Sequence, residues 1–125
     1  PPTHPLVEAD RFPVERLRQE PFIEFLPGQE TDNSRMLQQL QIRPKIRFAT
    51  SDSRAAIAMV RAGLGITLLN DILTADLADG VAVLPLDPPQ SVHLGIALPE
   101  EEHVSPAAKR FITYALDRLP ELDVL

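Results

Sequence analysis

The sequence predicts an α/β fold in which a largely parallel sheet is covered by helices on both faces, giving three layers. Two observations lead to this prediction. Short apolar runs alternate with segments of helical periodicity along residues 21–86, in the order strand, helix, strand, helix, strand, helix, strand. Each helical segment lies between two strands, where parallel strands require a crossover connection.

Composition places the chain among globular proteins. Its 125 residues, 44% hydrophobic and 24% charged, suffice for one domain or one lobe of a larger module. The absence of cysteine excludes disulfides and thiolate metal sites, and fits the reducing cytoplasm where we expect the protein. Apolar runs are far shorter than the roughly 20 residues of a membrane span. A net charge of -6 would repel a phosphate backbone, so we expect no direct DNA binding by this segment.

The first elements follow from proline positions and from one compact apolar run. Pro5 and Pro13 interrupt any long helix, which leaves an extended segment and a short helical turn over residues 14–18. Residues 21–26 are a compact apolar run that suits a buried strand. Pro27 and Gly28 then form a turn.

A helix and a second strand follow this turn. Four side chains able to cap a helix, residues 31–34, precede apolar residues at helical spacing, among them Met36 and Leu40. This helix should end before Pro44. Residues 45–49 alternate polar and apolar side chains, which predicts a strand with one face more covered than the other.

The next helix has the strongest pattern in the chain. It combines capping residues, apolar residues three and four positions apart and a glycine stop, namely Ser51, Asp52, Ser53, Ala56, Ile57, Val60, Gly63 and Leu64. A strand over residues 66–69, a short helix over 71–78 ended by Gly80, and a strand over 81–86 complete the alternation.

The last part of the chain begins after the turn-forming residues 87–90. Residues 92–98 are predicted as an apolar strand, and residues 100–102 as an acidic loop. Ser105 and Pro106 are typical of a helix start. The helix that follows carries one apolar stripe, made of Ala108, Phe111, Ile112, Ala115 and Leu119.

Residues 51–69, SDSRAAIAMVRAGLGITLL, closely resemble the effector domain of bacterial LysR-type transcriptional regulators. The shared pattern is an acidic-capped helix, then Val-x-x-Gly-Leu-Gly, then a strand. Residues 4–6, 17–23, 80–86 and 105–112 resemble later and earlier blocks of the same family in the expected order. The likeness covers essentially the whole chain.

The resemblance implies one lobe of a two-lobed fold like the type 2 periplasmic binding proteins, with a ligand cleft between the lobes. Residues 1–20 would be a hinge segment from the first lobe, residues 21–90 the effector-binding lobe, and residues 91–125 a strand and helix returning to the first lobe. Because the chain starts at Pro1 without a Met, we interpret it as an excised fragment. DNA would be bound only through an absent amino-terminal helix-turn-helix domain.

Thr50, Ser51 and Asp52 are the leading candidates for effector contacts. They stand where a strand passes into a helix, and open α/β sheets bind ligands beyond the carboxyl ends of their strands. Free amides and the helix dipole favour an anion there, and the two hydroxyls suit a small anionic or polar metabolite. From the residues alone, Ser51 or Asp52 acting merely as a helix cap is the stronger reading. The resemblance to the LysR-type family favours an effector contact as the role of Ser51.

Two further pairs are candidate contacts. Pro27 and Gly28 border the cleft in the family that the chain resembles. Gly65 and Ile66 follow the helix of residues 53–64, where a Gly-x-Gly pattern brings backbone close to a neighbour. Packing is the favoured explanation of the Gly-x-Gly pattern, because a glycine commonly ends a helix and turns the chain into a strand.

The sequence favours neither a metal, nor a cofactor, nor an enzyme. His4, His93 and His103 lack the short spacing of a metal pair, and residues 100–102 do not converge on one ion without special loop geometry. No Gly-x-Ser-x-Gly elbow is present. Besides an effector-sensing domain, the sequence is also compatible with a solute-binding protein of a transport system. A small α/β enzyme that uses Asp52 or a histidine is a third hypothesis and ranks below these two.

The resemblance also implies partners. The effector domains of this family work as homodimers or homotetramers, in which cleft closure around the effector shifts the arrangement of the subunits. We expect the apolar faces of residues 92–98 and of the last helix to drive self-association, because the lobe that would cover them is not in the chain.

Overall fold

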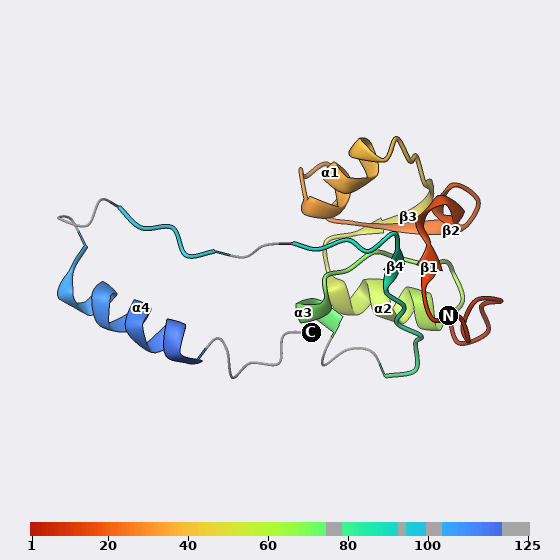
Figure 1. Ribbon diagram of the computed structural model, residues 1–125. Coiled ribbons are helices and arrows are strands. Elements are labelled where there is room, and N and C mark those ends of the chain that lie inside the picture. Colours follow the sequence, from red (N-terminus) through yellow and green to blue (C-terminus); the bar gives the residue numbers. More distant parts are fainter. Residues whose placement is uncertain (75–78, 93–94, 100–103, 119–125) are drawn as a thin grey trace. The chain divides into compact units, whose positions relative to one another are not determined.

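A computed structural model describes residues 1–74, 79–92, 95–99 and 104–118 (Figure 1). The chain divides into two compact units, Pro1–Ser91 and Val92–Leu125. Among the described residues, no helix is long and apolar enough to cross a bilayer.

The described residues of the first unit form eight short elements. In chain order they are strand β1 (Phe12–Pro13), the 3-10 helix η1 (Val14–Arg18), strand β2 (Pro21–Phe25), helix α1 (Asp32–Gln39), strand β3 (Lys45–Thr50), helix α2 (Ser53–Arg61), helix α3 (Asp71–Thr74) and strand β4 (Leu86–Asp87). The predictions of η1, β2, α1, β3 and α2 are confirmed. The predicted helix over 71–78 is present as α3, and residues 75–78 lie outside the described residues.

Two parallel strand pairs form the sheets. β2 pairs with β3, from Pro21 beside Lys45 to Phe25 beside Thr50, with a register shift between Phe22 and Ile23. On its other side β2 meets Ile66 in an isolated parallel bridge. β1 pairs with β4 in a separate two-stranded sheet. The strands are parallel as predicted, but the described residues form two small sheets in place of one continuous sheet.

β2 contributes one buried side chain to the apolar cluster on each of its two faces. Its neighbouring residues Phe22 and Ile23 point to opposite faces, as side chains of a strand do. Phe22 is buried in a cluster against which Leu37 and Leu40, from α1 and its C-cap, pack. Ile23 is buried with Ala56 and Val60 of α2. The two helices therefore lie on opposite faces of β2, as Figure 1 also shows.

The predicted strand over residues 66–69 is wrong beyond its first residue. Ile66 makes ladder bonds with β2, since its N–H donates to the Pro21 carbonyl and its carbonyl accepts from Ile23 N–H, each at 2.9 Å. The next bond of the ladder is replaced, because the Thr67 hydroxyl donates to the Ile23 carbonyl at 2.8 Å. A side-chain hydrogen bond thus competes with the backbone pairing and ends the strand.

The predicted strand over residues 81–86 is also wrong in extent. Only Leu86 of that range belongs to a strand, because β4 starts where the two residues of β1 provide a partner. Pro85 cannot donate to a ladder and accepts from Phe12 N–H at 2.8 Å. Pro13 on the facing strand lacks an N–H as well, so the pairing stays short.

β3 is more exposed than its alternating pattern predicted. Residues 45–49 are all exposed, and the side chains include Ile46 at 52% and Phe48 at 42%. β3 has β2 on one side, and the described residues provide no strand on its other side. The position of β3 at the edge of its sheet explains why its alternating polar and apolar residues wrongly predicted a covered face.

The second unit contains helix α4 (Pro106–Arg118). Its predicted start is confirmed, because the Ser105 hydroxyl accepts from Ala108 N–H at 3.2 Å and Pro106 is the first helical residue. The predicted strand over 92–98 is not formed by the residues that are described there, Val92 and residues 95–98, since no paired strand faces them. Residues 93–94, the acidic loop and Leu119 lie outside the described residues.

Candidate functional site

Five of the seven candidate contacts lie together at the carboxyl ends of β2 and β3. Leu26, just after β2, donates its N–H to the Thr50 carbonyl at 2.9 Å. This bond holds the turn with Pro27 and Gly28 next to the junction between β3 and α2. Gly28 has a φ of +74°, a conformation that glycine adopts without strain. Both turn residues are exposed.

Asp52 caps α2. One carboxylate oxygen accepts from the N–H groups of Arg54 and Ala55, at 2.8 and 3.1 Å. Asp52 N–H in turn donates to the Thr50 hydroxyl at 3.1 Å. The capping interpretation therefore holds for Asp52, and Thr50 supports that cap. Two amides at this helix start are already satisfied by a carboxylate, which leaves less positive potential for an anionic ligand than a free helix start would.

Ser51 is the side chain of this junction that is most available to a ligand. It is exposed, it lies between two residues engaged in the cap, and its hydroxyl can both donate and accept. Ser53, the first residue of α2, is half-buried. The junction between β3 and α2 thus offers a ligand the Ser51 hydroxyl, next to the carboxylate of Asp52.

Gly65 and Ile66 lie elsewhere. Ile66 pairs with Phe22 near the beginning of β2, whereas the other five candidates follow its end. A Cβ on Gly65 would overlap the carbonyl oxygen of Pro21, so the close backbone approach requires glycine. These two residues pack the chain against the start of β2, and the structure does not bring them to the edge formed by the other five.

The helix stop that precedes them is also visible. Gly63 has a φ of +76° and donates to the Val60 carbonyl at 2.9 Å, while Leu64 donates to the Met59 carbonyl at 3.1 Å. This is the Schellman arrangement that ends helices. Gly63 therefore has a structural role, as its position after the periodic stretch predicted.

Sequence reasoning missed Asn33 and Thr67. Asn33, in the first turn of α1, donates from its carboxamide to the Leu68 carbonyl at 3.0 Å, across 35 residues. Asn33 had been counted as one of four capping side chains. The cap is instead Thr31, which exchanges hydrogen bonds with Ser34 in a capping box. A local pattern cannot reveal a bond to a segment so distant in the sequence.

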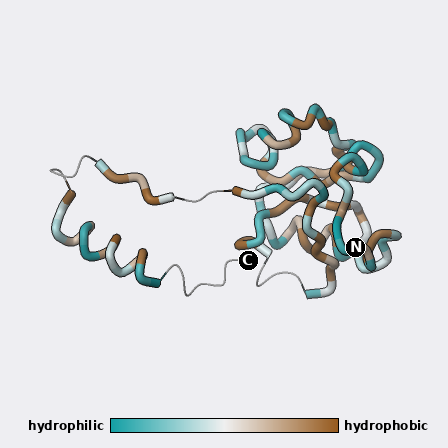
Figure 2. The backbone as a smooth tube through the Cα atoms, viewed as in Figure 1, coloured by the Kyte–Doolittle hydropathy of each residue, from teal (hydrophilic) through white to brown (hydrophobic). Residues whose placement is uncertain are grey.

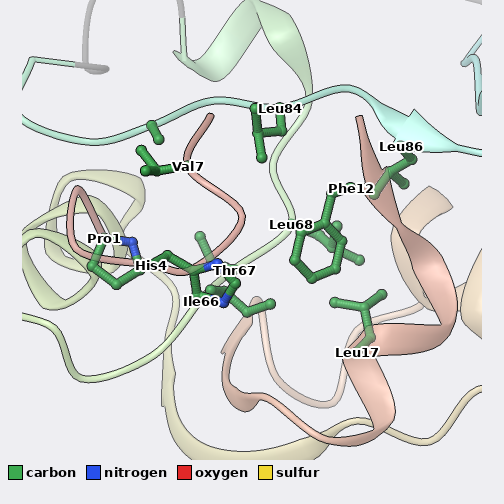
Figure 3. Close-up of a pocket in the computed structure, with 11 residues that line it drawn as sticks. Pro1, His4, Val7, Phe12, Leu17, Ile66, Thr67, Leu68, Leu84 and Leu86 are labelled. Carbon is green, nitrogen blue, oxygen red and sulfur yellow. The ribbon is translucent and has the colours of Figure 1, made fainter. Parts of the chain in front are cut away.

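An apolar pocket lies apart from these five candidates, with a volume of about 90 Å³. Its wall comes from residues 1–17, from residues 66–68 and from residues 82–86 (Figure 3). Figure 3 shows Phe12, Leu17, Leu68 and Leu86 on one side, and Pro1, His4 and Val7 on the other. Ile66 thus contributes to this pocket and not to the edge around Ser51.

His4 lies close to Glu20, the residue just before β2. Its Nδ1 accepts from Leu6 N–H at 3.1 Å. Its Nε2 lies 3.4 Å from Oε2 of Glu20, and Glu20 Oε1 accepts from Arg16 at 2.8 Å. The ring of His4 also packs beside Phe12, with 6.0 Å between the ring centroids, which supports a packing role.

The described residues include no group of three His, Asp or Glu side chains that could hold a metal ion. His93 and His103 lie outside the described residues.

An exposed ion pair lies at the start of α1. Arg35 donates to Glu30 at 3.0 Å, and this hydrogen bond raises the pKa of the Arg35 guanidinium. Both side chains are mostly exposed, so the pair adds little to stability.

The parallel strands and the flanking helices form a small α/β domain, and its polar edge lies at the strand ends, where open α/β sheets bind ligands. Comparison with known proteins identifies the family. Residues 1–120 match the LysR substrate binding domain, and the chain belongs to that family. No curated protein matches the chain.

Solved structures share the fold. The chain is similar to the effector binding domain of QuiR in complex with shikimate, with 23% identity and a TM-score of 0.66 over 99% of this chain and 60% of that one. It is also similar to a protein from Pseudomonas aeruginosa assigned to the LysR family of transcriptional regulators, with 20% identity and a TM-score of 0.59 over 95% of this chain and 43% of the other. The chain therefore spans less than two thirds of either structure.

Proposed function

We propose that the chain is the effector-sensing part of a bacterial LysR-type transcriptional regulator. Family membership over residues 1–120 carries this proposal, and the exposed polar edge at the carboxyl ends of β2 and β3 supports it. In this function a small molecule binds at the edge and changes the populations of the arrangements that the subunits adopt. DNA is bound by an amino-terminal helix-turn-helix domain of the whole protein, and the regulator acts in the cytoplasm.

The effector meets Ser51, Thr50 and the turn of Pro27 and Gly28. Asp52 restricts which part of the effector can approach, because its carboxylate caps α2 and repels a second negative charge. The effector therefore presents hydroxyl or other neutral polar groups to Ser51, and any carboxylate of the effector points away from Asp52. Shikimate, the ligand in the similar QuiR domain, combines ring hydroxyls with one carboxylate.

The proposed architecture is one lobe of a type 2 periplasmic-binding-protein-like module with helices on both faces of a three-layer sheet. The opposite faces of β2, covered by α1 and α2, support this. Residues 1–20 form the hinge, residues 21–90 the effector lobe, and residues 91–125 return to the first lobe. The whole regulator assembles as a homodimer or homotetramer.

The transport alternative and the enzyme alternative receive less support. The same kind of module serves solute-binding proteins, but the family that matches the chain is that of LysR regulators. For catalysis, the closest candidate, Asp52, is engaged in capping α2. We therefore propose a regulator without catalytic activity.

A melting-temperature screen tests this function. The probes are shikimate, its hydroxyl-poor analogue benzoate, and inorganic phosphate. Binding stabilises the folded state, so shikimate at saturating concentration should raise the melting temperature by about 5 °C. Ser51→Ala should remove most of that rise, and Ser91→Ala, which deletes an exposed hydroxyl elsewhere, should preserve it. An equal rise in both variants would contradict the proposed site.

A further inference from the structure

The first turn of α1 is attached to a distant segment by one side chain. Among the residues that the structure describes, Asn33 makes the one side-chain hydrogen bond that joins α1 to a distant segment, to the Leu68 carbonyl at 3.0 Å. Asn33 is half-buried. Because Thr31 and Ser34 already cap the helix reciprocally, Asn33 is not needed for the cap and its carboxamide serves the distant contact.

The Leu68 carbonyl depends on Asn33 as a donor because the β2 ladder ends before Leu68. The segment leaves the β2 ladder after Ile66, since the Thr67 hydroxyl takes the Ile23 carbonyl that the ladder would have used. The Leu68 carbonyl is therefore outside a regular ladder although its residue is half-buried. A carbonyl in such surroundings requires a donor, and Asn33 supplies it.

This bond anchors the helix that follows the turn of the candidate site. On one side of β2, the bond from Leu26 N–H to the Thr50 carbonyl fixes the turn beside the α2 junction. On the other side, Ile66 pairs with β2, and two residues further on the Leu68 carbonyl accepts from Asn33. The start of α1 follows the turn by only a few residues, so Asn33 fixes where that helix begins relative to Ser51 and Gly28.

We propose that Asn33 is a positioning residue of the effector site, holding the first turn of α1 against Leu68 so that the turn of Pro27 and Gly28 faces the effector in one arrangement. This inference rests on the proposed function. Asn33 acts through the backbone it anchors and is not itself assigned to contact the effector. The requirement is for a donor, because its partner is a carbonyl oxygen.

Asn33→Asp tests the role with little change of shape. The carboxylate cannot donate and would face the Leu68 carbonyl, so the link is lost. The same carboxylate near a helix start is favourable for the helix itself. A merely local role therefore predicts an unchanged or more stable α1, and the positioning role predicts a loosened edge. Gln38→Glu is the matched control, an amide-to-acid change on an exposed residue of the same helix.

Hydrogen exchange on the intact chain gives the first readout. Ile66 N–H, which donates to Pro21, should exchange about five- to tenfold faster in Asn33→Asp, the change expected for one lost hydrogen bond. Arg35 N–H, inside α1, should not exchange faster. Gln38→Glu should leave both rates unchanged. Unchanged exchange at Ile66 in Asn33→Asp would overturn the proposal.

Titration with shikimate gives the second readout. Asn33→Asp should weaken shikimate binding at least about fivefold, in proportion to the loosened edge, and Gln38→Glu should not. Equal affinity in the two variants would overturn the positioning role even if exchange changes. A wild-type chain that does not bind shikimate would count against the proposed function instead, and exchange at Ile66 would then decide on the Asn33 link alone.

Discussion

Helices α2 and α4 have the same kind of sequence and very different surroundings. Each begins with a side-chain cap, Asp52 or Ser105, and each carries apolar residues three and four positions apart. α2 buries Ala56, Ile57 and Val60, whereas no residue of Pro106–Arg118 is buried. Phe111 is 63% exposed, and Figure 2 shows apolar positions recurring along α4. Caps and periodicity thus predict a helix, but burial depends on a partner that the helix itself does not supply.

The largest expected effect concerns the side chain that α2 covers. Ile23 is fully buried against α2, so Ile23→Ala should lower the free energy of unfolding by about 3 kcal/mol through lost burial and a cavity. Phe111→Ala on α4 should change it by less than about 0.5 kcal/mol, since that ring is mostly exposed. Urea unfolding measures both values. A cost for Phe111→Ala as large as that for Ile23→Ala would contradict the contrast.

The next effect concerns the glycine that follows α2. Gly65→Ala should lower the free energy of unfolding by about 2 kcal/mol, because the added methyl group meets the Pro21 carbonyl and forces a backbone shift. Gly95→Ala, in the second unit, has open space around the new methyl group and should be close to neutral. Chemical denaturation of the two variants checks the difference, and a neutral Gly65→Ala would show that the approach is not constrained.

A smaller effect separates the caps. Asp52→Ala should cost about 1 kcal/mol because two amides of α2 lose their acceptor, and Asp52→Ser should restore most of it. Ser105→Ala should instead reduce the helix content of α4 by circular dichroism, since α4 has no buried residue to hold it. If both cap deletions had the same effect on global stability, the two helices would not differ as described.

The smallest effect concerns self-association. Phe111→Lys should weaken association of the isolated chain by about 1 kcal/mol, because it replaces an exposed apolar side chain on α4 with a charge. Sedimentation over a concentration series measures it. Arg110→Ala, an exposed neighbour outside the apolar stripe, is the control. A wild-type chain that stays monomeric at high concentration would contradict the expectation.

The comparison also shows which features the sequence could predict. Helices and their ends depend on residues close together, such as Asp52 with Arg54 and Ala55, or Gly63 with Val60, and these were predicted well. Strand extents depend on distant partners. Residues 66–69 were predicted as a strand, and the Thr67 bond to Ile23 that ends the ladder joins residues 44 positions apart.

The same limit applies to the candidate site. The edge around Ser51 could be predicted because a strand end and a helix start adjoin in the sequence. Gly65 and Ile66 were included because they lie close to the same helix in the sequence, yet they sit near the beginning of β2. Asn33 was missed because its bond to Leu68 has no local signature.

The most direct test of the sensor account is a map of backbone amide resonances during titration of the chain with shikimate. The account predicts that shifts concentrate at Leu26, Gly28 and residues 50–53, at the carboxyl ends of β2 and β3. Shifts confined to the pocket lined by Phe12, Leu84 and Leu86, with none near Ser51, would contradict it.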